Sequence, residues 1–134
     1  MVIETSYTFG TRIDGEIADV RPRVEAALRD EGFGVLTEID VAAVLKARLR
    51  VERPPYLILG ACNPTLDHAA LDIEPSVGAL LPCNVGLRED EPGETTVEIL
   101  DPQAVLSLAA DIELGPLATV ARERLRRMLA ALAG

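Results

Sequence analysis

The stretch YLILGACNP, residues 56–64, sets the expected fold of this chain. Its first seven residues carry no charge and are apolar on both faces, which is typical of a central strand that is covered on both sides. Asn63 and Pro64 end that strand, because the residue before a proline avoids the helical region and a proline favours the first turn of a helix. We therefore predict a central strand over residues 56–62 and a helix that ends near Ile73.

The residues before this stretch predict two strands and two helices. Apolar residues recur at helical spacing after Glu16, with Asp14 as the expected cap and Gly32 as the stop. Alternation in the following strand predicts one shared face for Phe33, Val35, Thr37 and Ile39. In chain order, the expected elements are a strand over 2–9, a turn over 10–15, a helix from 16 to about 32, a strand over 33–39 and a short helix capped by Asp40.

The residues after it predict a hairpin and two helices. Pro82 marks the next strand as an edge strand or a bulge, because proline cannot donate to the ladder. The expected elements are a strand over 80–87, a charged hairpin turn over 89–94, a strand over 95–100, a helix from Asp101-Pro102 to about Ala110 and an amphipathic helix from Leu117. The hairpin favours antiparallel pairing and strict strand–helix alternation is missing, so we predict one α+β domain over 1–134, with a mixed or antiparallel sheet covered by helices. A doubly wound parallel sheet is the alternative.

The charge balance argues against two classes of partner. Of the 134 residues, 13 are Lys or Arg and 22 are Asp or Glu, so the net charge is −9. A nucleic-acid binder needs a basic face that displaces counterions, and an anionic membrane makes the same demand, so we expect neither as a partner. The sequence shows no membrane-spanning run and no secretory signal, which predicts a cytoplasmic location. The one dense basic cluster, expected to be solvated or ion-paired, comprises Arg122, Arg124, Arg126 and Arg127.

The most unusual local feature is a repeated Cys-Asn pair beside a proline, Cys62-Asn63 and Cys83-Asn84. If the two strands are neighbours, the thiols could face one another across the sheet. Cys62 directly precedes a helix start, where free N–H groups and the helix dipole favour the reactive thiolate. Asn63 could donate hydrogen bonds to a bound carbonyl, oxyanion or thiolate. The alternative is that both cysteines are small core residues.

His68 is the only histidine of the chain. It could activate Cys62 as a nucleophile, with Asp67 or Asp72 as the orienting group, although a histidine beside an aspartate in a first helical turn is more often solvated. Cys62, Cys83, His68 and an aspartate have no recognised zinc spacing, so no metal site is predicted. No phosphate-binding loop, nucleophile elbow or metalloprotease motif occurs, and the sequence identifies no cofactor.

Three motifs in order resemble the bacterial and archaeal domain of unknown function 302 family. They are EGFGVLTEID at 31–40, YLILGACNP at 56–64 and LLPCNV at 80–85, and the likeness extends through Asp101-Pro102. The resemblance implies an α+β fold in which helices pack on one curved antiparallel sheet, similar to the TATA-binding-protein-like architecture. It also implies a homodimer. The family has no established activity to transfer, and the DNA-binding likeness concerns the fold alone.

Three functional hypotheses follow. The favoured one is a small-ligand or thiol-site binding protein, whose site comprises Cys62, Asn63, Cys83, Asn84 and His68. The second is a structural or protein-interaction module, which would use the acidic surface, the arginine cluster and a sheet edge at Pro82. The third is an enzyme that uses the Cys62 thiolate in redox, persulfide or thiol-transfer chemistry.

Overall fold

The computed structural model describes residues 2–109 and 111–133. Six strands form one sheet in the order β1-β2-β6-β5-β4-β3, and every neighbouring pair is antiparallel. This arrangement confirms the α+β prediction and excludes the parallel alternative. The strands are β1 (Val2–Glu4), β2 (Thr8–Asp14), β3 (Gly34–Asp40), β4 (Tyr56–Cys62), β5 (Cys83–Glu91) and β6 (Glu94–Leu100).

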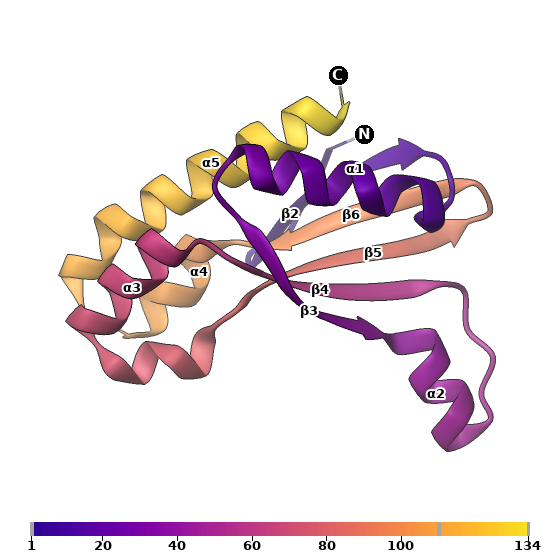
Figure 1. The fold of residues 1–134 in the computed structure, drawn as a ribbon, viewed down its shortest axis with the longest axis horizontal. Helices are drawn as coiled ribbons and strands as arrows, with labels where there is room; N and C mark the ends of the chain where they lie inside the picture. The colour runs from indigo at the N-terminus through magenta and orange to yellow at the C-terminus, as the bar shows by residue number, and fades with distance from the viewer. Residues whose placement is uncertain (1, 110, 134) are drawn as a thin grey trace.

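The helices divide into three groups around the sheet (Figure 1). The two longest, α1 and α5, lie together over one face, α3 and α4 lie at one end, and α2 projects away at the other end. The helices are α1 (Ile17–Asp30), α2 (Val41–Leu49), α3 (Pro64–Ile73), α4 (Pro102–Leu106) and α5 (Gly115–Ala133), and the short 3₁₀ helices are η1 (Pro75–Leu80), η2 (Ser107–Ala109) and η3 (Ile112–Leu114).

The hydrophobic core fills the space between the sheet and the pair α1 and α5. Every second residue of the inner strands points into it, as the period of a strand requires. The fully buried members are Leu59 of β4, Val85 and Leu87 of β5, Val97 and Ile99 of β6, Val24 and Leu28 of α1, and Leu125 and Met128 of α5. The β4 and α3 boundaries agree with the prediction. The expected cover on both faces of β4 is wrong, because α1 and α5 cover one face while Tyr56 and Ile58 line an open groove on the other.

The N-terminal prediction was wrong, because residues 8–14 form a strand and the turn comes earlier. Thr5 holds that turn: its Oγ1 accepts hydrogen bonds from the N–H groups of Tyr7 and Thr8. Gly10 is a strand residue because β2 and β6 approach closely there, and a Cβ atom would lie 2.2 Å from the carbonyl oxygen of Val97. A strand glycine at a close backbone approach was therefore misinterpreted as a turn glycine.

Two of the predicted helix caps, Asp40 and Asp101, are present, the one at Asp14 is wrong, and Asn63 is a cap that was not predicted. Asp40, Asn63 and Asp101 each accept a hydrogen bond from an N–H group in the first turn of the following helix. At α1, however, the N-cap residue is Glu16 and not Asp14. The Ile17 N–H group instead donates to Oε1 of Glu89, at 2.7 Å, from a strand 72 residues further along the chain.

A bulge in β3 corrects the predicted face of that strand. The register shifts between Val35 and Thr37, so that Val35 pairs with Ala61 while Thr37 pairs with Gly60. The extra residue reverses the alternation. Val35 therefore shares the core face with Ala61, whereas Thr37 and Ile39 lie on the opposite face.

Pro82 lies outside the ladder, which corrects its predicted place in an edge strand. Strand β5 begins at Cys83, lies between β4 and β6, and continues to Glu91. Proline is therefore accommodated just before the first ladder position of an inner strand. Three other boundaries also differ: the hairpin turn is limited to 92–93, α4 ends at 106 and continues as η2, and α5 begins at 115. The predicted end at Ala110 falls outside the described residues.

The sheet face opposite α1 and α5 carries an ion-paired network around Glu98. Thr8 Oγ1 donates to Oε2 of Glu98 at 2.5 Å, and Nη1 of Arg88 donates to Oε1 at 2.6 Å. Burial raises the pKa of Glu98, but the hydrogen bonds from Thr8 and Arg88 outweigh it and hold that pKa below its ordinary value of 4.5.

This depressed pKa predicts acid-sensitive stability. A carboxyl whose folded pKa lies below its unfolded value stabilises the fold above the unfolded pKa, and that contribution is lost as the pH falls through the folded pKa. Between about pH 5 and pH 3, the free energy of unfolding should therefore fall more steeply for the wild type than for Glu98→Gln. Urea denaturation at several pH values measures this difference. Equal slopes would show that Glu98 contributes nothing to the acid response.

Candidate functional site

The two Cys-Asn pairs lie on neighbouring strands but do not meet as predicted. Ala61 pairs with Cys83, and Gly60 pairs with Asn84. Because side chains alternate along a strand, Cys62 does not share a face with Cys83, and both cysteines are free thiols. The expectation that the thiols face one another is therefore wrong.

Asn63 occupies the junction between β4 and α3 and is almost completely buried, at 3% exposed. Its Oδ1 accepts a hydrogen bond of 3.1 Å from the N–H group of Leu66, which caps the helix. This bond identifies Nδ2 as the other atom of the amide. Among residues 2–109 and 111–133, Nδ2 has no hydrogen-bond partner. Buried polar groups are normally paired, so this atom is unusual.

Asn63 lines a partly enclosed cavity of about 50 Å³, which we call the Asn63 pocket. The pocket lies where α3, α4 and α5 meet the ends of β4 and β5. Its wall is mostly apolar, and among the described residues its polar side chains are Asn63, Asp67 and Cys83. The apolar part of the wall includes Phe33, Ala61, Leu66, Ala70, Leu106, Ala121 and Leu125.

Both thiols are held in their protonated form. Burial raises the pKa of Cys62 to about 11, aided by a hydrogen bond to Asp67 and by the charge of that carboxylate. Burial also raises the pKa of Cys83 to about 12, with smaller contributions from the charges of Asp67 and Asp101. The Cys83 thiol donates to the carbonyl oxygen of Leu100 at 3.4 Å. The predicted activation of Cys62 by the helix dipole is therefore wrong, because burial and Asp67 act in the opposite direction.

These pKa values predict slow alkylation. Raising the pKa of Cys62 from 9.0 to about 11 lowers its thiolate fraction at pH 8 by about a hundredfold, and the thiolate is the nucleophile. Iodoacetamide should therefore modify Cys62 about a hundred times more slowly than it modifies an unfolded control peptide. Mass spectrometry of the wild type and of Cys62→Ser assigns the modified residue. Modification at the rate of the peptide would contradict this account.

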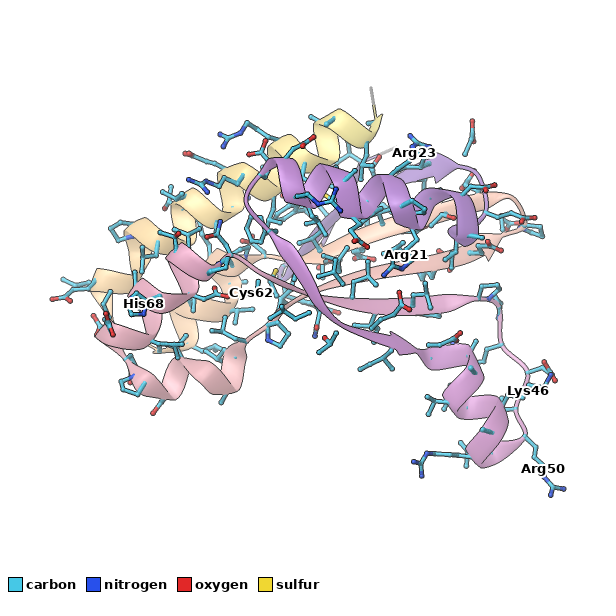
Figure 2. The ribbon with its side chains drawn as sticks, in the orientation of Figure 1. Arg21, Arg23, Lys46, Arg50, Cys62 and His68 are labelled. Atoms are coloured by element: carbon cyan, nitrogen blue, oxygen red, sulfur yellow. The ribbon has the colours of Figure 1, made fainter. Side chains whose placement is uncertain are left out.

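The remaining predicted site residues lie outside the pocket. His68 is exposed and pairs with Asp72, with 3.6 Å between Nε2 and Oδ2. Figure 2 shows His68 on α3, apart from Cys62 at the end of β4. Asn84 is exposed and lines a separate groove on the opposite sheet face, together with Arg88 and Glu98. The structure therefore brings Asn63 and Cys83 together in the pocket wall, which includes none of the other predicted site residues, Cys62, His68 and Asn84.

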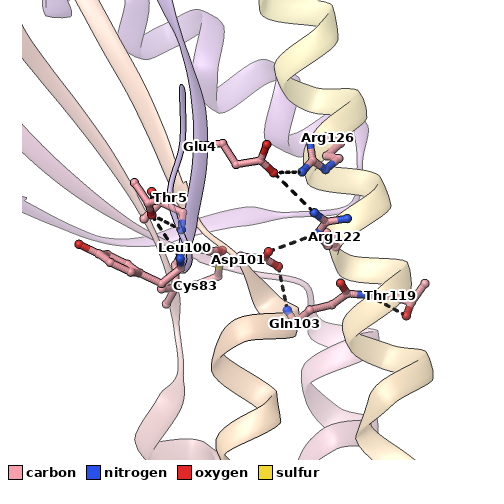
Figure 3. Close-up of polar contacts among 11 residues, drawn as sticks. Glu4, Thr5, Cys83, Leu100, Asp101, Gln103, Thr119, Arg122 and Arg126 are labelled. Atoms are coloured by element: carbon pink, nitrogen blue, oxygen red, sulfur yellow. Dashed lines mark hydrogen bonds and ion pairs between the residues drawn. The ribbon is translucent and has the colours of Figure 1, made fainter. Parts of the chain in front are cut away.

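Three of the four arginines in the cluster form ion pairs, in agreement with the prediction of a solvated or ion-paired cluster. Arg122 contacts Asp101, with 3.2 Å between Nε and Oδ2, and Arg126 contacts Glu4 at 2.8 Å (Figure 3). Arg127 pairs with Glu31. The guanidinium groups of Arg122 and Arg126 also lie over the Phe9 ring. These contacts tie α5 to the rest of the fold, so the cluster is a structural feature.

Sequence reasoning missed most of the pocket wall. Leu106, Ala121 and Leu125 come from segments that are far from the Cys-Asn motifs along the chain. The helical spacing of Ala121 and Leu125 predicted only an apolar stripe, and such a stripe does not reveal where packing leaves a cavity. Within the described residues, no group of three or more His, Cys, Asp or Glu side chains is placed to hold a metal ion, and no helix is long and apolar enough to cross a membrane.

Comparisons with known proteins agree on one family. The family model described as "Domain of unknown function DUF302" matches residues 9–132. A solved structure, the crystal structure of an uncharacterized conserved DUF302 protein from Bacillus stearothermophilus, superposes with a TM-score of 0.88 and 26% sequence identity. The match covers 96% of this chain and 99% of that chain. No curated protein matches the sequence.

Proposed function

This chain belongs to the DUF302 family, and we propose that it binds a small molecule in the Asn63 pocket. The observation that carries the proposal is the cavity itself, a partly enclosed and mostly apolar space of about 50 Å³ at the junction of β4, β5, α3, α4 and α5. Empty apolar space costs stability, because the side chains around it lose van der Waals contacts. A small ligand in the pocket restores those contacts.

The size of the pocket limits the ligand. Pockets for drug-sized molecules measure roughly 300–1,000 Å³, whereas the Asn63 pocket measures about 50 Å³. A nucleotide or a flavin is too large, while a molecule of a few heavy atoms fits. The mostly apolar wall favours a ligand with an aliphatic body, because burial of apolar surface drives its binding.

A pocket-filling substitution tests this proposal. Ala121 lines the pocket from α5, whereas Ala130 is exposed on the same helix, so Ala121→Leu and Ala130→Leu form a matched pair. In a two-dimensional amide NMR titration with xenon, the resonances of Leu66 and Ala70 should shift in the wild type and in Ala130→Leu. They should stay unchanged in Ala121→Leu. The absence of shifts in the wild type, or equal shifts in Ala121→Leu, would contradict the proposal.

A second candidate function is association with a second copy of the chain through the arm, which we define as residues 36–55. None of the nine residues of α2, all of which the structure describes, is buried. A concentration of exposed apolar side chains on one segment marks an interaction surface. The large hydrophobic residues that are exposed on the arm are Leu36, Ile39, Val44, Leu49 and Val51.

Charge favours a second copy as the occupant. Residues 41–55 contain four basic side chains and one acidic side chain, a net charge of +3, so the rest of the chain carries −12. Figure 2 shows Lys46 and Arg50 projecting from this segment. The basic residues 41–55 of the arm are complementary to the acidic body of another copy. The sequence suggested a sheet edge at Pro82 and the arginine cluster as interaction surfaces. We propose the arm in their place, because Pro82 precedes an inner strand and Arg122, Arg126 and Arg127 form ion pairs within the chain.

Analytical ultracentrifugation tests the dimer. Leu49 is 65% exposed on the arm and Leu108 is 74% exposed elsewhere, so Leu49→Glu and Leu108→Glu are matched substitutions. The wild type and Leu108→Glu should sediment as dimers, while Leu49→Glu should sediment as a monomer. A monomeric wild type, or a dimeric Leu49→Glu, would overturn the arm as the interface.

A further inference from the structure

The sheet face opposite α1 and α5 carries an open groove of about 330 Å³, which we call the tyrosine groove because both tyrosines of the chain line it. Its lining includes Tyr7, Tyr56, Ile58, Gly86, Arg88 and Leu100. We propose that this groove receives the arm of a second copy of the chain, whose own groove receives the arm of the first. This inference rests on the proposed dimer, because it names the surface that the arm contacts.

The strand register gives the groove an open floor. One row of paired residues crosses this face of the sheet and contains, in order, Ile39, Ile58, Gly86, Glu98 and Gly10. Gly86 leaves the floor without a side chain, and the ring of Tyr56 lies beside it. Tyrosine and arginine are enriched in protein–protein interfaces, and such interfaces centre on pockets that receive an apolar side chain. The tyrosine groove has this composition and this shape.

The arm and the groove lie on the same side of the sheet. Ile39 belongs to the arm and pairs directly with Ile58, which lines the groove, so the two surfaces are continuous. Figure 1 shows α2 on the side of the sheet away from α1 and α5. A twofold axis on this side brings each arm to the groove of the other copy, so one interface contains two equivalent contacts.

Helix α2 has the composition of a buried helix. Seven of its nine residues are apolar, yet none of the nine is buried within its own chain. Lys46 and Arg48 are two positions apart, so they project from nearly opposite sides of the helix and neither side is purely polar. A helix that is apolar all round is normally surrounded by other protein. A groove of a second copy covers the sides of α2 that its own chain leaves exposed.

Charge selects the contact between arm and groove over the two symmetric alternatives. Residues 41–55 carry a net charge of +3. Among the described residues, the open sheet face has a net charge of −2, from Arg12, Arg88, Asp14, Asp90, Glu94 and Glu98. Two arms or two sheet faces would bring like charges together, which costs free energy, whereas an arm on a sheet face brings opposite charges together.

Complementation between two variants tests this contact. Leu49→Glu alters the arm and leaves the groove intact, whereas Gly86→Leu fills the groove and leaves the arm intact. A Cβ atom at residue 86 would lie 3.6 Å from the ring of Tyr56, an ordinary contact, so Gly86→Leu should fold. Tyr7→Glu is a second groove variant, because Tyr7 is 60% exposed. Gly34→Leu is the control, since Gly34 is a strand glycine with open space beside it and is not part of the groove lining.

Analytical ultracentrifugation and circular dichroism are applied to each variant. The wild type and Gly34→Leu should be dimers, while Leu49→Glu, Gly86→Leu and Tyr7→Glu should be folded monomers. An equimolar mixture of Leu49→Glu and Gly86→Leu should form a heterodimer, because the intact arm of one fits the intact groove of the other. This heterodimer should bind roughly tenfold or more tightly than either variant binds itself, the effect of one intact central contact. If Gly86→Leu is unfolded, Tyr7→Glu takes its place in the mixture.

NMR locates the contact within the heterodimer. When unlabelled Gly86→Leu is added to ¹⁵N-labelled Leu49→Glu, the amide resonances of Tyr56 and Ile58 should shift. If Leu49→Glu is monomeric but both groove variants remain dimers, the arm contacts another surface, so this inference is wrong and the proposed dimer stands. Absence of a heterodimer would also overturn the contact between arm and groove. A monomeric wild type would remove the proposed dimer itself.

Discussion

Leu125→Ala should lower the free energy of unfolding by about 3 kcal/mol, the middle of the range for a fully buried leucine. Leu125 is 0% exposed and contributes both to the main core and to the wall of the Asn63 pocket. Its removal costs apolar burial and leaves a larger cavity, because the helices around it collapse only in part. Urea denaturation monitored by circular dichroism measures the change.

Leu108→Ala is the control for this prediction. Leu108 is 74% exposed, so its truncation should change the free energy of unfolding by less than about 0.5 kcal/mol. The enlarged pocket of Leu125→Ala should also bind xenon more tightly than the wild type does. A loss of less than about 1 kcal/mol in Leu125→Ala would show that α5 does not pack on the sheet as described.

Gly10→Ala should destabilise the protein by about 3 kcal/mol, at the upper end of the usual cost of overpacking. A Cβ atom at residue 10 would lie 2.2 Å from the carbonyl oxygen of Val97 and 2.9 Å from the Cα atom of Glu98. Both are backbone atoms of β6, so no side-chain rotation relieves the clash. The two strands must separate, which weakens the pairing of β2 with β6. Thermal and urea denaturation measure the effect.

Gly34→Ala is the matched substitution, because Gly34 is also a strand glycine but a Cβ atom there meets no other atom within 4 Å. Its stability should stay within about 0.5 kcal/mol of the wild type. Equal effects of Gly10→Ala and Gly34→Ala would refute the close approach of β2 and β6. A Gly10→Ala variant as stable as the wild type would also refute this close approach.

Local signals predicted those parts of the fold in which neighbouring residues determine the structure. The strand at 56–62, the caps at Asp40 and Asp101, and the hairpin before β6 all depend on contacts within a few residues. The N-terminal strands could not be predicted in this way. Gly10 has the same local signal in a turn and at a close strand contact, and only the position of β6 distinguishes the two.

In the candidate site, too, local signals predicted some features and missed those that depend on contacts between distant segments. Asn63 was identified as a potential donor because an Asn-Pro pair after a strand places it at a helix start. The cavity that Asn63 lines is a property of the packing among three helices, which the sequence does not encode locally. His68 was wrongly assigned to the site because it is close to Cys62 in the sequence. Its side chain nevertheless points to solvent, since position along a helix decides which way a side chain faces. A reactive Cys62 was one of the hypotheses, because the sequence shows the helix start after it but not its burial.

The most direct test of the ligand pocket is a crystal structure of the protein under xenon pressure, with xenon as the probe. We predict density for the probe between α3, α4 and α5, against the apolar wall that includes Leu66, Ala121 and Leu125. The same crystal form of Ala121→Leu serves as the control and should be empty at that position. Density for an ordered water network in the wild-type pocket, with the probe absent or bound elsewhere, would contradict the account.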